Sequence, residues 1–304
     1  MISINSLTKL YPGSALPAVD GLSLEVNDGE IVGFAGLNGA GKTTTLRVCV
    51  GLLFPTRGKV MIDGKDIVRE KRAASLAVGW APEFPNFDQS SKPIPLLRYH
   101  GRFYDVERRE MESRIEHLIR AVGLSEHTEK RLRDYSQGMK KRFSLALALI
   151  SDPHNLLLDE SLNGLDPEGI KYVKDLVLLM KKQGKAIFLS SHILSELENV
   201  ADRIAIIKSG KLAAVVDRSE LPRLGNKISI RISVCNRDEA MFKILGRYGD
   251  IHTEEDDIII TNLRVDAGNA ALLNNELVRA GYSVFKFVVE GESFENYFLS
   301  IVGT

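Results

Sequence analysis

The chain has 304 residues, its 40 Lys and Arg balance 40 Asp and Glu, and 44% of its residues are hydrophobic. This composition is typical of a globular protein with a sizeable core, and the length suggests one large and one small domain. The zero net charge removes the electrostatic argument for nucleic acid or an anionic membrane surface as the main partner. The sequence has no apolar run of about 18 residues, so no membrane-spanning helix is expected, and its start lacks the pattern of a signal peptide.

In the first part of the chain, β-rich runs alternate with helical patterns, which predicts an α/β domain with a mostly parallel sheet. The expected strands are residues 2–7, 22–26, 31–35, 59–62, 77–80, 155–158, 186–189 and 203–207. Helices are expected over residues 42–52, 167–182 and 193–200. From about residue 83 to 150 the periodicity is helical only, with segments near 94–104, 107–122 and 138–150, which predicts a helical insertion into the core.

A polar stretch with proline and glycine, residues 221–226, separates the expected domains 1–220 and 221–304. The second domain is expected to contain strands at 227–234, 258–261 and 283–289, and helices at 238–248, 267–280 and 294–302. That size and order predict a small α+β domain of the split βαβ type.

The strongest local motif is the run Gly-Leu-Asn-Gly-Ala-Gly-Lys-Thr at residues 36–43, which matches the phosphate-binding P-loop at every fixed position. An expected strand leads into it and an expected helix follows. Glycines let backbone N–H groups surround phosphates, and the helix N-terminus adds a positive dipole end. Lys42 is expected to reach the β and γ phosphates, and the Thr43 hydroxyl to ligate Mg²⁺.

A second signal is the apolar run Asn-Leu-Leu-Leu that ends in Asp159 and Glu160. A buried strand that delivers Asp159 beside the P-loop would place a carboxylate for Mg²⁺. Glu160 would then be available to polarise the attacking water. The two acids predict a hydrolytic nucleotide site in combination with the P-loop.

Between these motifs lies the run Tyr-Ser-Gln-Gly-Met at residues 135–139, just before a helix. With it, the chain resembles the ATP-binding subunit of an ABC transporter, whose signature is Leu-Ser-Gly-Gly-Gln. Ser136 and Gly138 match the signature, and the other three positions differ in a way that resembles the drug and lipid exporter branch. A serine at a helix start suits a γ-phosphate, and N-capping by Ser136 is compatible with that use. The basic run that follows, residues 140–142, is interpreted as a solvated helix face in preference to the alternative, a patch that binds nucleic acid.

The resemblance covers about residues 2–216 and implies roles at further positions. It places Asp166 in a D-loop that contacts a partner subunit, His192 at the γ-phosphate and catalytic water, and Tyr11 against adenine. Two positions depart from the family pattern: Glu83 stands where a glutamine is usual, and Ser161 where proline is common. A carboxylate at Glu83 could still reach Mg²⁺ or its waters, but adds negative charge beside the phosphates.

The implied site has catalytic Glu160 and His192, Mg²⁺ ligands Thr43, Asp159 and Glu83, and a nucleotide-binding set made of Tyr11, Gly36, Asn38, Gly39, Gly41, Lys42, Thr43, Thr44, Ser136 and Gly138. The implied fold is a P-loop ABC cassette with a helical insertion, and the implied activity is Mg²⁺-dependent ATP hydrolysis. Two cassettes, identical or related, are expected to sandwich two ATP molecules head to tail.

The resemblance also implies a separate transmembrane permease, which the cassette powers from the cytoplasmic face of the membrane. Export is favoured by the signature variant and by residues 291–300, which are similar to the C-terminal stretch of exporter subunits in this branch. The alternative is an ABC ATPase that acts on ribosomes or DNA. A single P-loop and the short separation of 116 positions from Thr43 to Asp159 argue against those architectures, so nucleic acid is not expected as a partner. The third possibility is a regulatory or immunity protein that binds ATP without transport.

Overall fold

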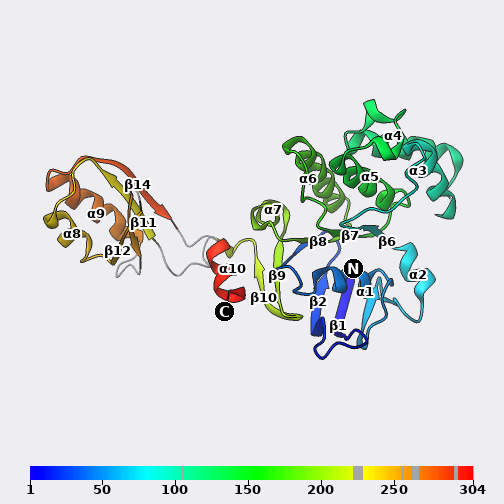
Figure 1. Cartoon of the computed structure of the whole chain (residues 1–304), viewed down its shortest axis with the longest axis horizontal. Helices are drawn as coiled ribbons and strands as arrows, with labels where there is room; N and C mark the ends of the chain where they lie inside the picture. The colour runs from blue at the N-terminus through cyan, green and yellow to red at the C-terminus, as the bar shows by residue number, and fades with distance from the viewer. Residues whose placement is uncertain (105, 222–228, 255–256, 262–266, 291–293, 304) are drawn as a thin grey trace. The chain divides into compact units, whose positions relative to one another are not determined.

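The computed structural model describes residues 1–104, 106–221, 229–254, 257–261, 267–290 and 294–303. The chain divides into two compact units, Met1–Arg218 and Ser219–Thr304 (Figure 1). Residues 222–226 of the expected linker lie outside the described residues, as do the first two residues of the strand expected from 227 and residues 291–293 of the exporter-like stretch.

The first unit is built on a six-stranded sheet in the order β10-β9-β3-β8-β7-β6. Strands β9, β3, β8, β7 and β6 are parallel, and β10 pairs with β9 in the antiparallel sense. Strands β3, β7 and β8 are buried along their whole length, which explains their largely apolar sequences. The strands are β3 (Ile31–Ala35), β6 (Val78–Ala81), β7 (Asn155–Asp159), β8 (Ala186–Ser191), β9 (Arg203–Lys208) and β10 (Lys211–Asp217).

A separate antiparallel sheet has the strand order β2-β1-β4-β5. Along the chain, β1 and β2 come before β3 of the parallel sheet, and β4 and β5 come between β3 and β6. The prediction of one mostly parallel sheet is therefore wrong for the strands expected at 2–7, 22–26 and 59–62, which belong to this antiparallel sheet. Strand β2 alternates buried and exposed residues, as expected for a sheet with one face packed on the core. One continuous apolar cluster lies between the two sheets, and it includes Phe34 and Phe188 with ring centroids 5.0 Å apart. The strands are β1 (Ile2–Lys9), β2 (Val19–Val26), β4 (Arg57–Ile62) and β5 (Lys65–Asp66).

The expected helical insertion is present, and Figure 1 shows its helices gathered beyond β6 and β7. It contains α3 (Pro93–Gly101), α4 (Arg108–Ala121) and α5 (Gln137–Leu149), with 3₁₀ turns η1 (Arg102–Tyr104), η2 (Ser125–His127) and η3 (Leu132–Asp134). Helix α4 buries one stripe at helical spacing, made of Met111, Ile115, Leu118 and Ile119. None of the helices in the described part of the chain combines the length and the apolar character needed to cross a bilayer.

The remaining helices of the first unit are α1 (Lys42–Cys49), α2 (Lys71–Leu76), α6 (Pro167–Lys182) and α7 (Leu194–Val200). Helix α1 ends three residues earlier than expected, and Gly51 follows its end with a φ of 72° in the left-handed region. Helix α6 begins as its sequence predicts, because Asp166 accepts a hydrogen bond from Gly169 N at 3.1 Å and Pro167 occupies the first helical position.

The second unit has a four-stranded antiparallel sheet in the order β12-β13-β11-β14, the order of a split βαβ domain. Strand β12 was not expected from sequence, because its residues Asp-Ile-His-Thr-Glu are mostly polar. An apolar cluster that includes Ile232, Ile260 and Leu273 forms its core. The elements are β11 (Ser229–Val234), α8 (Glu239–Leu245), β12 (Asp250–Glu254), β13 (Asp257–Thr261), α9 (Ala267–Arg279), β14 (Val284–Glu290) and α10 (Phe294–Val302).

Candidate active site

The P-loop connects buried strand β3 to helix α1, and its backbone path requires glycine at two positions. A Cβ on Gly36 would lie 2.7 Å from both Cγ2 and the carbonyl oxygen of Ile207. Gly41 has a φ of 112°, and a Cβ there would lie 2.4 Å from the Ala18 carbonyl oxygen. Gly39 also has positive φ, 80°, but open space beside it. Close backbone packing therefore determines the glycine pattern at Gly36 and Gly41.

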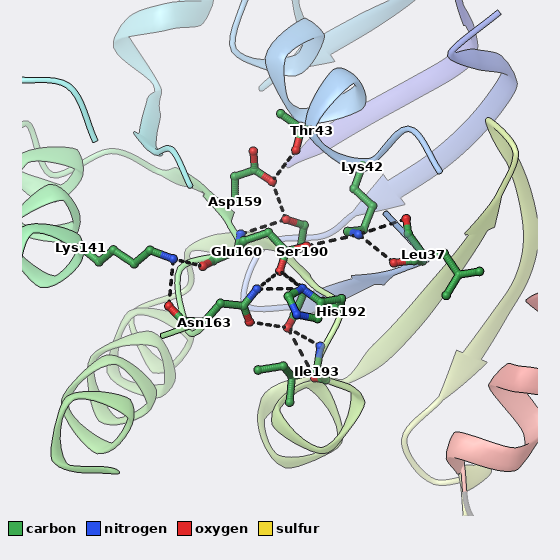
Figure 2. A network of polar contacts seen from close by, with 12 residues as sticks. Leu37, Lys42, Thr43, Lys141, Asp159, Glu160, Asn163, Ser190, His192 and Ile193 are labelled. Atoms are coloured by element: carbon green, nitrogen blue, oxygen red, sulfur yellow. Dashed lines mark hydrogen bonds and ion pairs between the residues drawn. The ribbon is translucent and has the colours of Figure 1, made fainter. Parts of the chain in front are cut away.

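Lys42 is buried at the first position of α1 and points back toward the P-loop. Its Nζ donates to the carbonyl oxygen of Gly36 at 2.7 Å and lies 3.2 Å from Oε1 of Glu160. Only 6% of each side chain in this ion pair is exposed. A buried charge pair of this kind is stable when both partners have further hydrogen bonds, and both do here (Figure 2).

Asp159 ends β7 beside the start of α1. Its Oδ1 accepts hydrogen bonds from the Thr43 hydroxyl at 3.2 Å and the Ser190 hydroxyl at 2.7 Å. Its second oxygen, Oδ2, is buried and has no hydrogen-bond partner among the residues that the structure describes. Burial raises the pKa of Asp159, while the bonds from Ser190 and Thr43 oppose that rise. A buried carboxylate oxygen without a partner, next to a threonine hydroxyl, suits a hard divalent cation such as Mg²⁺.

Glu160 follows Asp159 directly and has a backbone φ of 49°, in the left-handed region that residues other than glycine rarely adopt. Its Oε2 accepts a hydrogen bond from Asn163 Nδ2 and one from His192 N at 3.2 Å, and it lies 3.0 Å from His192 Nδ1. Its backbone N–H donates to the carbonyl oxygen of Ser190 at 3.1 Å. Loops after β7 and β8 therefore hold the carboxylate from two sides, as Figure 2 shows.

A cavity of about 360 Å³ lies in front of these groups. Glu83 lines it, so the residue that replaces the usual glutamine does face the site. The other lining residues are Ala18, Leu37, Asn38, Gly39, Gly41, Lys42, Thr43, Thr44, Glu160 and His192. The expected nucleotide-binding residues of the P-loop and both expected catalytic residues thus surround one hollow, except for Gly36, which is buried and does not line it.

Tyr11 lies at the margin of this region and is not among the residues that line the cavity. Its hydroxyl is 3.3 Å from the Thr44 hydroxyl, and the Lys9 ammonium lies 5.5 Å from its ring centroid. The Tyr11 hydroxyl therefore contacts the P-loop helix at Thr44, while the Lys9 ammonium covers one face of the tyrosine ring.

The signature loop lies at the start of α5 and outside the cavity. The Ser136 hydroxyl accepts a hydrogen bond from Met139 N at 3.1 Å, which caps the helix. A Cβ on Gly138 would lie 3.5 Å from Leu165, so the loop borders the turn expected to be the D-loop. Tyr135 has a structural role, because it is buried and its hydroxyl donates to the carbonyl oxygen of His127 at 2.9 Å.

Three residues that contact Asp159 or Glu160 were not predicted as site residues: Lys141, Asn163 and Ser190. The interpretation of residues 140–142 as a solvated face is wrong for two of the three. Lys141 Nζ donates to the carbonyl oxygens of Glu160 and Asn163, and Arg142 Nη1 donates to those of Val122 and Gly123. The available signal was helical spacing, because Lys141 shares a face of α5 with buried Ser144 and Leu145.

The comparisons with known proteins agree with this geometry. The ABC transporter family model matches residues 19–163. The bacitracin transport ATP-binding protein BcrA of Bacillus licheniformis is 34% identical over 307 residues, which cover 100% of this chain and 97% of that protein. The Nod factor export ATP-binding protein I of Rhizobium meliloti is 36% identical over 213 residues, which cover 70% of this chain and 63% of that protein.

Solved structures agree as well. A structure described as the ATP binding subunit of an ABC transporter is 27% identical with a TM-score of 0.68, and the match covers 73% of this chain and 92% of that one. A dimeric ATP-binding cassette bound to ADP and Pi has the same fold, with a TM-score of 0.66, 21% identity and coverage of 72% of this chain and 99% of that one. These relatives do not support the nucleic-acid alternative. The chain therefore belongs to the ATP-binding subunits of ABC transporters, ATPases that power transport across a membrane.

Proposed function

We propose that the chain hydrolyses Mg²⁺·ATP in the cavity between the P-loop and Glu160, and that this hydrolysis drives an exporter. The observation that carries the proposal is the buried Lys42–Glu160 pair, at 3.2 Å, beside the unpartnered Oδ2 of Asp159. A cation, a general base and a free metal ligand thus lie together at the carboxyl edge of parallel strands, where open α/β sheets bind ligands.

In this proposal the P-loop binds the phosphates of ATP. Backbone N–H groups of the glycine-rich loop and the N-terminus of α1 face the cavity and favour an anion. The Lys42 ammonium exchanges its Glu160 partner for phosphate oxygens, because a polyphosphate offers more negative charge than one carboxylate. The Thr44 side chain lines the phosphate end, and Tyr11 stacks on adenine with the ring face that Lys9 leaves open.

Asp159 and Thr43 are proposed to hold Mg²⁺, with Glu83 as an additional oxygen ligand for the ion or its waters. The donor set is oxygen only, as Mg²⁺ requires, and Asp159 Oδ2 accepts no hydrogen bond from the described part of the chain that an ion would have to displace. When bound, the ion neutralises charge on the β and γ phosphates. Thr43 and Ser190 meanwhile keep the Asp159 carboxylate in one orientation through Oδ1.

Glu160 is proposed as the general base. Once Lys42 turns to phosphate, Oε1 of Glu160 is released toward the cavity and can accept a proton from water. The other oxygen stays fixed by Asn163 and His192, so the base keeps its direction. His192 is proposed to help hold the water and the γ-phosphate, since its side chain is half exposed and lines the cavity.

Ser136 and Gly138 are proposed to act on a second cassette. They do not line the cavity of their own chain, and Ser136 is exposed at a helix start where an anion is favoured. Two copies arranged head to tail place each signature loop against the nucleotide of the other copy, with Asp166 at the contact. The dimeric state of the structural relative bound to ADP and Pi supports this arrangement.

The membrane partner is proposed to be a separate permease, which the helical insertion contacts from the cytoplasmic face. The Nod factor export ATP-binding protein supports export over import, and the bacitracin transport ATP-binding protein supports a role in transport. Recovery of the full chain with a polytopic membrane protein would support this part of the proposal. Purification with ribosomes or DNA instead would contradict it.

The catalytic assignment is tested with Glu160→Gln and a matched control, Glu168→Gln, which changes an exposed carboxylate in the following helix. We expect Glu160→Gln to bind ATP, form dimers in ATP and hydrolyse it at least about a hundredfold more slowly, because it lacks the base. The Glu168→Gln chain should match the wild type in a phosphate-release assay. Wild-type turnover by Glu160→Gln would show that Glu160 is not the base.

A further inference from the structure

Lys141 extends from helix α5 to the turn that carries Glu160. Its Nζ donates to the carbonyl oxygens of Glu160 and Asn163, each at 2.9 Å (Figure 2). Asn163 in turn donates from its side-chain amide to the Glu160 carboxylate. One ammonium group therefore contacts the backbone at both ends of the turn 160–163, and the second end holds the carboxylate itself.

The backbone of the turn 160–163 is strained at Glu160, so a contact that holds it in place stabilises this conformation. Glu160 has a φ of 49°, a left-handed conformation that is unfavourable for a residue with a side chain. Within the turn, Asn163 N donates to the Glu160 carbonyl oxygen at 3.2 Å, so that oxygen accepts from two donors. Strained backbone at a functional site persists when its surroundings hold it in place. Lys141 is such a surrounding group, and it comes from a different element.

The electrostatic setting matches this arrangement. Burial lowers the pKa of Lys141, while the nearby carboxylates of Glu83, Glu160 and Asp159 raise it. A partly buried ammonium needs hydrogen-bond acceptors, and the two carbonyl oxygens supply them. The lysine thus brings positive charge to the side of the turn opposite Lys42, at the cost of its own solvation.

We propose that Lys141 is a positioning residue for ATP hydrolysis, which clamps the turn 160–163 and so directs the Glu160 carboxylate toward the water. This inference rests on the proposed role of Glu160 as the base. It goes beyond that role because it makes α5, the helix that begins at the signature serine, a support of the catalytic carboxylate in the same chain.

The test compares Lys141→Met, which keeps the length of the side chain and removes its donors, with Lys140→Met on the adjacent position. We expect Lys141→Met to lower kcat by about ten- to a hundredfold, since a small misplacement of a catalytic group has effects of that size. The KM for ATP and the ATP affinity should remain within about twofold of wild type. Lys140→Met should retain wild-type kcat, and Lys141→Arg, which can donate to both carbonyls, should recover most of it.

A double variant separates positioning from general stability. In the Glu160→Gln background, Lys141→Met should cause no further loss of the residual rate, because a residue that acts through Glu160 has nothing left to position. If Lys141→Met does not yield folded protein by circular dichroism, Lys141→Gln takes its place in the same comparison.

Wild-type kcat in Lys141→Met, a loss of ATP affinity with unchanged kcat, or an additional loss in the double variant would each overturn the inference. Failure of the underlying proposal is distinguishable. In that case Glu160→Gln alone would hydrolyse ATP at the wild-type rate, whatever the effect of Lys141.

Discussion

Lys42 and Glu160 form an ion pair inside the candidate active site, with Nζ of the lysine 3.2 Å from Oε1 of the glutamate. In the proposed mechanism each group has another partner, phosphate for Lys42 and water for Glu160. That mechanism therefore requires the pair to separate when nucleotide binds. Both side chains are buried, and a buried charge without a partner would cost several kcal/mol. The ion pair avoids that cost in the absence of nucleotide.

Breaking this pair should be visible in nucleotide affinity. Glu160→Gln removes the competitor for Lys42, so we expect the variant to bind a non-hydrolysable ATP analogue about three- to tenfold more tightly than wild type, or up to about 1.4 kcal/mol. Isothermal titration calorimetry measures the difference, with Glu168→Gln as the control. Weaker binding by Glu160→Gln would mean that the ion pair does not oppose nucleotide.

Asp159→Asn should separate activity from stability. Burial raises the pKa of the folded-state carboxyl above its ordinary value, so its ionisation at neutral pH costs stability, and the neutral amide removes that cost. The amide oxygen can still accept from Thr43 and Ser190. We expect Tm at pH 7 to be unchanged or higher and ATP hydrolysis to fall at least about a hundredfold, because the carboxylate proposed to hold Mg²⁺ is lost. A lower Tm together with retained hydrolysis would contradict the assignment.

Ser136 can be tested for a role beyond helix capping. Ser136→Ala removes the acceptor for Met139 N and should cost about 1 kcal/mol of unfolding free energy. Ser136→Asp keeps a good cap, so its stability should equal that of wild type, but it places negative charge where a γ-phosphate is proposed to bind. Chemical denaturation and steady-state ATPase assays give the two readouts. Full activity in Ser136→Asp would show that Ser136 serves as a cap and no more.

The second unit should be sensitive to acid through Asp257. The Lys286 ammonium, the Ser233 hydroxyl and the Arg231 guanidinium donate to its carboxylate, and together they hold its pKa below the ordinary value of 3.8. A lowered folded-state pKa contributes stability above pH 3.8 that is lost as pH falls through the folded pKa.

Lys286→Met removes the largest of these contributions. We therefore expect protection of β13 amides from hydrogen exchange to decrease in Lys286→Met at pH 6, and to differ less from wild type as the pH falls below 3.8. The exposed Lys243→Met variant on α8 is the control. A difference between Lys286→Met and wild type that grows toward acid would reverse the predicted sign.

Much of the cassette was predictable because its determinants are local. Gly41 indicates a left-handed backbone position, and Asp166 followed by Pro167 predicts the start of α6. The strand β3 is buried on both faces, so its apolar run is readable without knowledge of its neighbours. The separate antiparallel sheet was not predictable in the same way, because which strands pair depends on contacts far apart in sequence.

The active site divides along the same line. The motifs alone singled out the residues proposed to carry the chemistry: Lys42, Asp159 and Glu160 by type and spacing, and His192 through the family resemblance. The tertiary structure decided what those residues contact and how they are held. It paired Glu160 with Lys42, left one oxygen of Asp159 without a partner among the described residues, and showed that Lys141, expected at the surface, donates to the backbone of the turn that carries Glu160. Such contacts join α5, β7 and β8, and only the packing of these elements brings them within hydrogen-bond distance.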